Sequence, residues 1–125
     1  MDINIDKLEA VIQELRSTLK DGLLASDIWD SSIGLSLAGY NPQPAAVALF
    51  TEMTNMLRTA LSDSGFPGLN RYFFLDLEGD HIVMIIRHGN GLLQGILMNS
   101  KKVNLGLLLS VVLPKMIASV EKARF

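Results

Sequence analysis

Hydrophobic residues recur along the chain with two different periods, which divide it into eight elements. Apolar residues spaced three or four apart are typical of a helix with one face on a core. Short apolar runs bounded by Gly, Pro, Asn or Asp are typical of strands. The pattern predicts helices over residues 5–20, 44–62 and 103–122, and strands over residues 23–29, 33–40, 71–77, 81–88 and 92–98.

The order of these elements, α-β-β-α-β-β-β-α, indicates the fold class. Connections at 78–80 and 89–91 are short and contain glycine, so the last three strands are expected to form an antiparallel meander. Five strands and three helices then favour an α/β (α+β) fold, in which a mostly antiparallel five-stranded sheet is sandwiched by helices. We expect one domain over residues 1–125 with a core from about residue 6 to residue 122.

Two local signals refine the helices. Gly22 follows the first helical pattern and is suited to a left-handed C-cap. Pro114 lies inside the last helical pattern, where a proline kinks the helix or loosens one turn.

The helix over 44–62 is more hydrophobic than one sheet requires. On a helical wheel its apolar residues share an arc of about 160°, wider than the ~100° stripe that covers a core. The strand over 71–77 is also rich in apolar residues and is a candidate for an unprotected sheet edge. Together they predict a second copy packed against both elements. The residues in the arc are Ala45, Ala46, Leu49, Phe50, Met53, Met56, Leu57, Ala60 and Leu61.

Composition narrows the classes of partner. The 125 residues are 49% hydrophobic and 19% charged, with a net charge of -2, which is typical of a packed globular domain. Such a charge does not favour nucleic-acid binding, which needs a basic patch. The adjacent pair Lys101 and Lys102 is better explained as a solvated start of the last helix.

Cysteine is absent, which excludes disulfides and thiolate chemistry and fits a reducing compartment. Residues 1–6 are acidic and polar, unlike a signal peptide, and the most apolar run, 105–113, is too short to span a bilayer. We therefore expect a cytoplasmic protein with no membrane insertion.

Candidate chemistry is sparse. His81 and His88 lie seven residues apart in one predicted strand, about 23 Å, too far to share a metal. Asp76, Glu78 and Asp80 are better explained by solubility of a hairpin than by a cation site. No nucleophile elbow or phosphate-binding glycine loop is present. We expect no enzyme activity, no catalytic residue, no metal and no cofactor.

Three segments, in their order and spacing, resemble the roadblock family of dynein-light-chain-like domains. Residues 33–41 resemble the second strand of its first hairpin, 76–80 resemble its central hairpin, and 103–108 resemble the Asn-Leu-Gly sequence that opens its last helix. The likeness covers about residues 6–122. Two positions depart from the family's pattern: residues 30–34 lack its usual first-hairpin spacing, and Leu109 and Ser110 stand where many members carry a basic residue.

The resemblance implies a dimer in which the middle helices pack antiparallel and the third strands pair edge to edge. It also implies a non-enzymatic scaffold or adaptor whose partner is a Ras-like small GTPase, a complex containing one, or another roadblock-like protein. The predicted dimer contacts are Leu49, Phe50, Met53, Thr54, Met56, Leu57, Leu61, Arg71, Tyr72, Phe73, Phe74 and Leu75.

Two alternatives remain open. A small-molecule sensory domain would need a pocket of about 300 Å³ or more between helix and sheet, lined by a few convergent polar groups. A small enzyme would need a strongly perturbed carboxylate or histidine in a cleft. Trp29, at the end of the first predicted strand, is interpreted as a core or rim aromatic.

Overall fold

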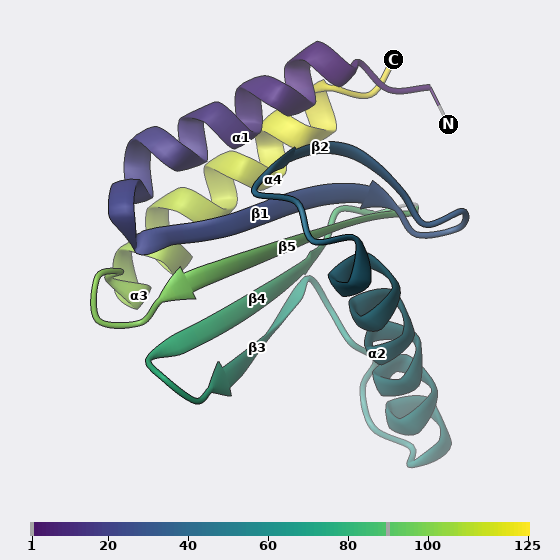
Figure 1. The fold of residues 1–125 in the computed structure, drawn as a ribbon. Helices are drawn as coiled ribbons and strands as arrows, with labels where there is room; N and C mark the ends of the chain where they lie inside the picture. The colour runs from purple at the N-terminus through teal and green to yellow at the C-terminus, as the bar shows by residue number, and fades with distance from the viewer. Residues whose placement is uncertain (1, 90) are drawn as a thin grey trace.

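The computed structural model of the protein describes residues 2–89 and 91–125. Its element order confirms the predicted α-β-β-α-β-β-β-α arrangement (Figure 1). The predicted connection at 89–91 contains Asn90, which lies outside the described residues. The elements are α1 (Ile5–Leu19), the short 3-10 turn η1 (Lys20–Gly22), β1 (Leu23–Asp30), β2 (Leu35–Tyr40), α2 (Pro44–Asp63), β3 (Tyr72–Leu77), β4 (His81–Arg87), β5 (Leu92–Asn99), α3 (Leu105–Leu107), the π-helical segment η2 (Leu108–Val112) and α4 (Leu113–Lys122).

The five strands form one antiparallel sheet in the order β2-β1-β5-β4-β3. The meander β3-β4-β5 is joined to the first hairpin through the pairing of β1 with β5. β3 pairs with β4 through residues 72–77 and with no other strand among the described residues, so it is one edge of the sheet. The antiparallel meander of the last three strands is the one expected, and the apolar third strand lies at an edge of the sheet.

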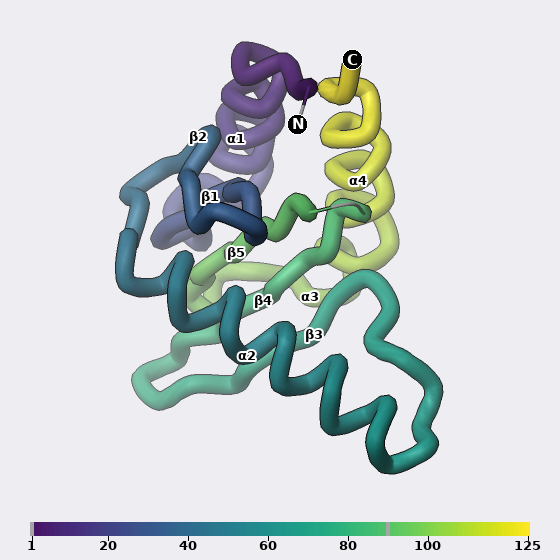
Figure 2. The backbone as a smooth tube through the Cα atoms, turned by 90° about the vertical axis from the view of Figure 1, so that its right-hand side faces the viewer, coloured from purple at the N-terminus to yellow at the C-terminus, as the bar shows by residue number. Residues whose placement is uncertain are grey.

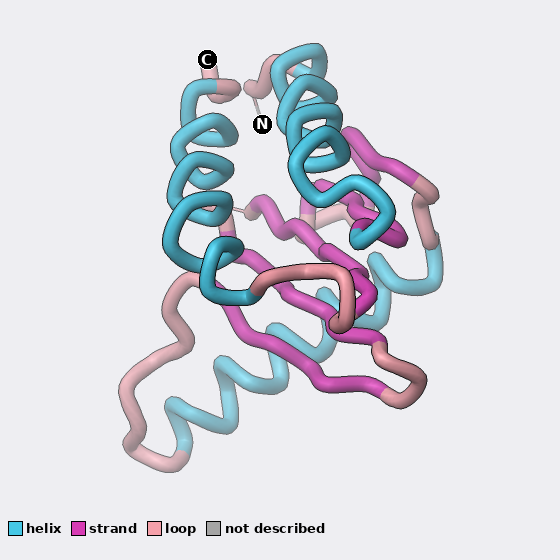
Figure 3. The backbone as a smooth tube through the Cα atoms, turned by 90° about the vertical axis from the view of Figure 1, so that its left-hand side faces the viewer, coloured by secondary structure: helices cyan, strands magenta, loops and turns pink. Residues whose placement is uncertain are grey.

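One face of the sheet is covered by α1 and α4, which lie side by side (Figure 3). Leu8, Ile12 and Leu15 of α1 are buried at the spacing that the sequence predicts. They pack with Met116 and Val120 of α4 and with the inward residues of the strands in the larger hydrophobic cluster. A Lys115–Glu14 ion pair of 2.5 Å crosses between the two helices at the surface. This side of the protein is a closed core.

The last helical region is interrupted as Pro114 predicts. Asn104 caps its start, because its side-chain oxygen accepts a hydrogen bond from the Leu107 N–H at 3.0 Å. The chain then widens into η2 before α4 begins at Leu113. Proline has no N–H to donate to the carbonyl four residues earlier, so the regular helix cannot continue through Ser110 and Pro114. The expected loosened turn is confirmed.

The end of α1 differs from the expectation. Lys20, with a φ of 53° and a ψ of -127°, is the residue with a positive φ, and Gly22 has none. Glycine at position 22 serves a different need. A Cβ there would lie 2.8 Å from the Val103 side chain, so a larger residue would displace the loop that leads to α3. The prediction of a Gly22 C-cap was wrong.

The other face of the sheet carries α2 alone, and α2 crosses it obliquely (Figure 2). Val47 and Thr54 are its only buried residues among those described. With Trp29, Val83, Ile85 and Leu93 of the strands, Val47 forms a second and smaller cluster, to which Phe50 and Phe73 add partly buried rings. The sheet is thus enclosed by helices on both faces, as predicted, but the α2 side is much less complete.

The described ends of the chain are held together beside α1 and α4. The Asn4 N–H donates to the Ala123 carbonyl at 2.7 Å, and the Phe125 N–H donates to the Asp2 carbonyl at 3.2 Å. None of the helices formed by residues 2–89 and 91–125 has the length and apolar character that crossing a membrane requires.

Candidate functional site

The two flanks of α2 differ sharply in exposure. Phe50 is half-buried against the sheet and Met53 is also half-buried, whereas Leu49 is 51% exposed and Met56 is 62% exposed. A surface helix normally turns such residues toward a core. The hydrophobic arc predicted from the sequence is therefore only partly covered by the chain itself.

The residues that α2 buries are not the ones at the centre of the apolar arc predicted from the sequence. The predicted apolar arc of this helix leaves out Thr51 and Thr54, but Thr54 is buried and Thr51 is half-buried. Their hydroxyls donate to the carbonyls of Val47 and Phe50, each at 2.7 Å, which satisfies them within the helix. The Trp29 indole N–H donates to the Thr51 hydroxyl at 2.8 Å and fixes the helix to β1.

The predicted contact residues of α2 fall into three groups. Leu49, Met56 and Leu57 are exposed, and Phe50, Met53 and Leu61 are half-buried. Thr54, at 3% exposure, is beneath the helix and out of reach of a partner in this conformation. The exposed and half-buried members remain candidates for contact with a second chain.

The predicted contact residues of β3 lie along the free edge. Arg71 is exposed and residues 72–75 are half-buried. Their side chains alternate: Phe73 and Leu75 join the cluster under α2, while Tyr72 and Phe74 pack on the α1 side, with their rings edge to face at 5.7 Å. The edge therefore offers backbone groups rather than one continuous apolar strip. We define the α2–β3 face as the exposed flank of α2 together with this strand edge.

An open groove of about 790 Å³ runs along α2. Ala48, Glu52 and Thr59 line it from the helix, and Ser31 and Gly34 line it from the turn between β1 and β2. The β1–β2 turn is held in place because the Ser32 N–H and hydroxyl both donate to Asp30 Oδ1, at 2.9 and 2.6 Å. The groove is a shallow surface rather than an enclosed ligand pocket.

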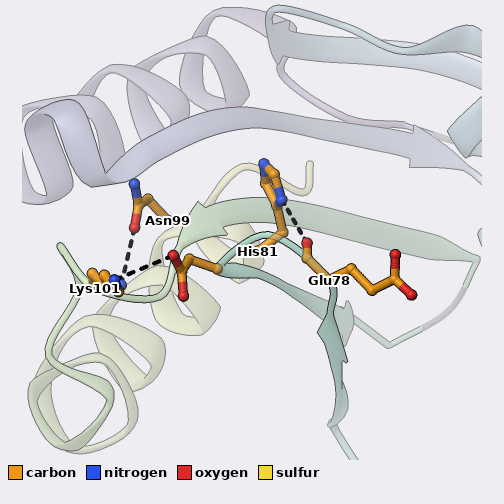
Figure 4. Close-up of polar contacts among 5 residues, drawn as sticks. Glu78, His81, Asn99 and Lys101 are labelled. Carbon is orange, nitrogen blue, oxygen red and sulfur yellow. Dashed lines mark hydrogen bonds and ion pairs between the residues drawn. The ribbon is translucent and has the colours of Figure 1, made fainter.

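The β3–β4 hairpin carries the acidic cluster noted in the sequence (Figure 4). His81 Nδ1 lies 2.9 Å from the Glu78 carbonyl, and Lys101 pairs with Asp80 at 3.5 Å. Lys101 also donates its backbone N–H to Asn99 Oδ1 at 3.0 Å. No group of three or more metal-ligating side chains occurs among the described residues. These contacts close the hairpin onto the end of β5.

His88 follows β4 and is buried, which the sequence did not indicate. Its Nε2 is 2.7 Å from the Gln94 side-chain oxygen, and Gln94 in turn donates to Ser26 Oγ at 3.2 Å. The pKa of His88 is lowered to about 4, mainly by burial and also by the positive charge of Arg124, while the hydrogen bond with Gln94 opposes the shift. The neutral ring is part of the core on the α1 and α4 side and is not placed for proton transfer to a ligand.

A second hollow lies between the start of α2 and the sheet. It has a volume of about 220 Å³, and its wall includes Trp29, Phe50 and the carboxyl-bearing residue Asp27. Asp27 is 8% exposed, and its pKa is raised, mainly by burial. The sequence prediction missed this residue. The adjacent polar pair Ser26 and Asp27 inside an otherwise apolar strand was the available signal.

No protein-family model and no curated protein matches the sequence. Several solved structures match the fold. MglB from Myxococcus xanthus has a TM-score of 0.79 at 12% identity, over 94% of this chain and 87% of that one. An MglB with a tetrameric arrangement has a TM-score of 0.70 at 14% identity, over 94% and 92%. A Roadblock/LC7 domain from Streptomyces avermitilis has a TM-score of 0.64 at 15% identity, over 91% and 94%. With the observed element order and sheet topology, these likenesses show that the chain folds as a roadblock-like domain.

Proposed function

We propose that this protein is a non-enzymatic scaffold that forms a homodimer through the α2–β3 face. The observation that carries the proposal is the exposure of Leu49 and Met56 on a helix beside an unpaired strand edge. Exposed apolar patches and open strand edges both cost solubility when they are left uncovered. A second copy would cover both features at once.

The geometry of the two elements suits a two-fold symmetric contact. Pairing of two β3 strands would satisfy the free N–H and C=O groups of each edge and join the sheets into one. The exposed flank of α2 mixes the large Met56 with the small Ala45 and Ala60, which allow two helix backbones to approach closely. A stable interface buries about 800 Å² per partner.

We infer further that the dimer binds a Ras-like small GTPase, or a complex that contains one. The support is the roadblock resemblance and the likeness of the fold to MglB. Any influence on GTP hydrolysis would act through the switch elements of the GTPase, and it would require different affinities for the two nucleotide states. The open groove along α2 shares Met56 and Ala60 with the proposed dimer contact, so only the part of it near the β1–β2 turn would stay free for a partner.

The sensory-domain alternative receives only limited support. The half-open hollow of about 220 Å³ is smaller than the ~300–1,000 Å³ of typical ligand sites. The larger groove is open along its length and is lined from one side by a single helix. We therefore retain the scaffold as the principal function.

The dimer is tested by Met56→Glu, measured by sedimentation velocity over a range of concentrations. Met56 lies on the surface, so the variant should fold. The charge of the new glutamate should oppose packing of α2 against the α2 helix of a second copy. Leu107→Glu is the matched control, because Leu107 is 56% exposed but lies on α3, on the other side of the sheet. We expect wild type and Leu107→Glu to be dimers and Met56→Glu to be monomeric. A wild-type monomer at every concentration contradicts the proposal.

The partner is tested separately with immobilised wild type and small GTPases from the same source, loaded with GDP or with a non-hydrolysable GTP analogue. We expect retention to depend on the nucleotide. No retention would reject the GTPase assignment, and equal retention in both states would reject an effect on the switch elements; neither result bears on the dimer.

A further inference from the structure

The backbone groups along the free edge of β3 alternate in direction. The Arg87 N–H donates to the Arg71 carbonyl at 2.7 Å, just before β3 begins its antiparallel pairing with β4. In an antiparallel pair, every second residue bonds to the residue opposite it, and the residues between turn their N–H and C=O groups the other way. Every second residue after Arg71 therefore bonds to β4. The N–H and C=O groups of Tyr72, Phe74 and Asp76 point out of the sheet edge.

These three outward residues match a second copy of the same edge in one register. A two-fold axis perpendicular to the sheet makes the two β3 strands antiparallel and keeps both α2 helices on one face. If Phe74 faces Phe74 of the second copy, Tyr72 faces Asp76 on either side of the axis, and every outward group has a partner. A shift by two residues leaves one outward residue of each β3 facing no residue of the other β3. The centred register therefore satisfies the most backbone groups.

The side chains agree with this register, because residues opposite each other in an antiparallel pair project to the same face. Phe73 would face Leu75 of the second copy on the α2 side, where both residues already belong to the smaller hydrophobic cluster. Phe74 would meet its own copy on the α1 side. Tyr72 packs its ring edge to face on Phe74 at 5.7 Å and would extend that contact. Apolar residues that are half-buried in one chain would thus be covered by the other.

The two ends of the edge carry opposite charges. Arg71 precedes β3, Asp76 lies near its end and Glu78 follows it, and all three side chains are exposed. None of the three forms an ion pair with another described residue. Antiparallel pairing of two copies brings the basic end of each edge to the acidic end of the other, whereas parallel pairing would bring like charges together. The edge is therefore complementary to itself.

We propose that β3 pairs with β3 of a second copy in the single register that places Phe74 on the two-fold axis, with Arg71 beside Leu77 and Glu78 of that copy. This inference rests on the proposed dimer and adds what selects the partner. The hydrogen-bonding groups, the apolar side chains and the charges of the edge are all matched by an antiparallel copy of the same strand.

The register is tested by disulfide crosslinking, since the chain has no cysteine of its own. Phe74→Cys, Phe73→Cys and Leu75→Cys each place a single thiol on the edge. Facing residues have Cα atoms about 4.5–5.5 Å apart, within reach of a disulfide, whereas residues two positions out of register exceed the limit of about 7 Å. On oxidation we expect Phe74→Cys to form a crosslinked dimer in non-reducing electrophoresis.

The other two cysteine variants are the matched controls. Phe73→Cys and Leu75→Cys should each crosslink poorly when oxidised separately. An equimolar mixture of the two should crosslink, because position 73 of one copy faces position 75 of the other. Crosslinking of the mixture shows that both thiols are reachable, and circular dichroism establishes that the variants are folded.

A second measurement uses exposed residues outside the core. Arg71→Glu and Glu78→Arg should each raise the dissociation constant of the dimer by about tenfold, because like charges then meet at both ends of the paired edge. The double variant Arg71→Glu/Glu78→Arg restores opposite charges. It should recover most of the wild-type affinity in sedimentation velocity.

Three results would overturn the register. Self-crosslinking of Phe73→Cys or Leu75→Cys in preference to Phe74→Cys would mean that the strands are shifted by two residues. A wild-type dimer for which no variant and no mixture crosslinks would mean that the copies meet through another surface. Additive weakening in the double charge variant would mean that the two charged ends do not meet. A wild type that is monomeric at every concentration contradicts the dimer itself, so sedimentation distinguishes that failure from a wrong register.

Discussion

The two faces of the sheet are covered by helices to different extents. Among the described residues, eighteen buried hydrophobic residues form the cluster under α1 and α4, and five form the cluster under α2. Both helical layers lie on the same strands, so the difference comes from the helices. α1 and α4 face the sheet with long aliphatic side chains, whereas α2 buries only Val47 and Thr54 there and adds the half-buried Phe50. One side is a closed core, and the other leaves apolar residues of α2 exposed.

The strongest test of this difference is Ile12→Ala. Ile12 is fully buried between α1 and the sheet, so its truncation leaves a cavity in the larger cluster. We expect a loss of roughly 2–5 kcal/mol in the free energy of unfolding, measured by urea denaturation. A loss below about 1 kcal/mol would mean that this side of the sheet is no more tightly packed than the other.

His88, on the α1 and α4 side of the sheet, should make the free energy of unfolding depend on pH. Its folded-state pKa of about 4 is below the ordinary value of 6.5, so the unfolded chain binds the proton first as pH falls. Stability should therefore decrease from about pH 6.5 to pH 4, by about 3 kcal/mol. Asp27 acts in the opposite direction, because its pKa is raised. His88→Gln isolates the histidine, and its unfolding free energy should lack this decrease. An unchanged pH profile in the variant would contradict the assignment.

The smallest effect is expected on the exposed flank of α2. Met56→Ala removes a side chain that the chain itself leaves largely uncovered. In a dilute sample containing only monomer, we expect a change within about 0.5 kcal/mol in the unfolding free energy. At concentrations that favour the dimer the loss should be larger. A large loss in the monomer would mean that Met56 belongs to the chain's own core.

Much of the fold was predictable from the sequence, because periodic apolar residues mark α1 and the strands to within two residues of their observed ends. The face of α2 was harder to predict. Thr51 and Thr54 count as polar on a helical wheel, but their hydroxyls bond to carbonyls of their own helix and can be buried. The apolar arc on the helical wheel leaves these threonines out. It therefore places the buried side of α2 too far from Thr54.

The candidate sites were less predictable, because they depend on residues that meet only in the fold. In the sequence Asp27 is one polar position in a strand. Its neighbours Ser36, Gly39 and Gly95 come close to it only in the folded sheet. In the sequence His88 is a residue at the end of a strand. Its contacts with Gln94 and Arg124 form only in the fold. Neither neighbourhood leaves a local motif.

The hydrogen bonds that join residues 2–4 to residues 123–125 have a practical consequence. Both described ends emerge at one pole, away from α2 in every view (Figure 1, Figure 2 and Figure 3). A short peptide bridging them would close the backbone into a ring, which could be reopened in the exposed 64–68 loop to give a circular permutant. A purification tag or fused fluorescent protein at either end would likewise leave the helix surface accessible.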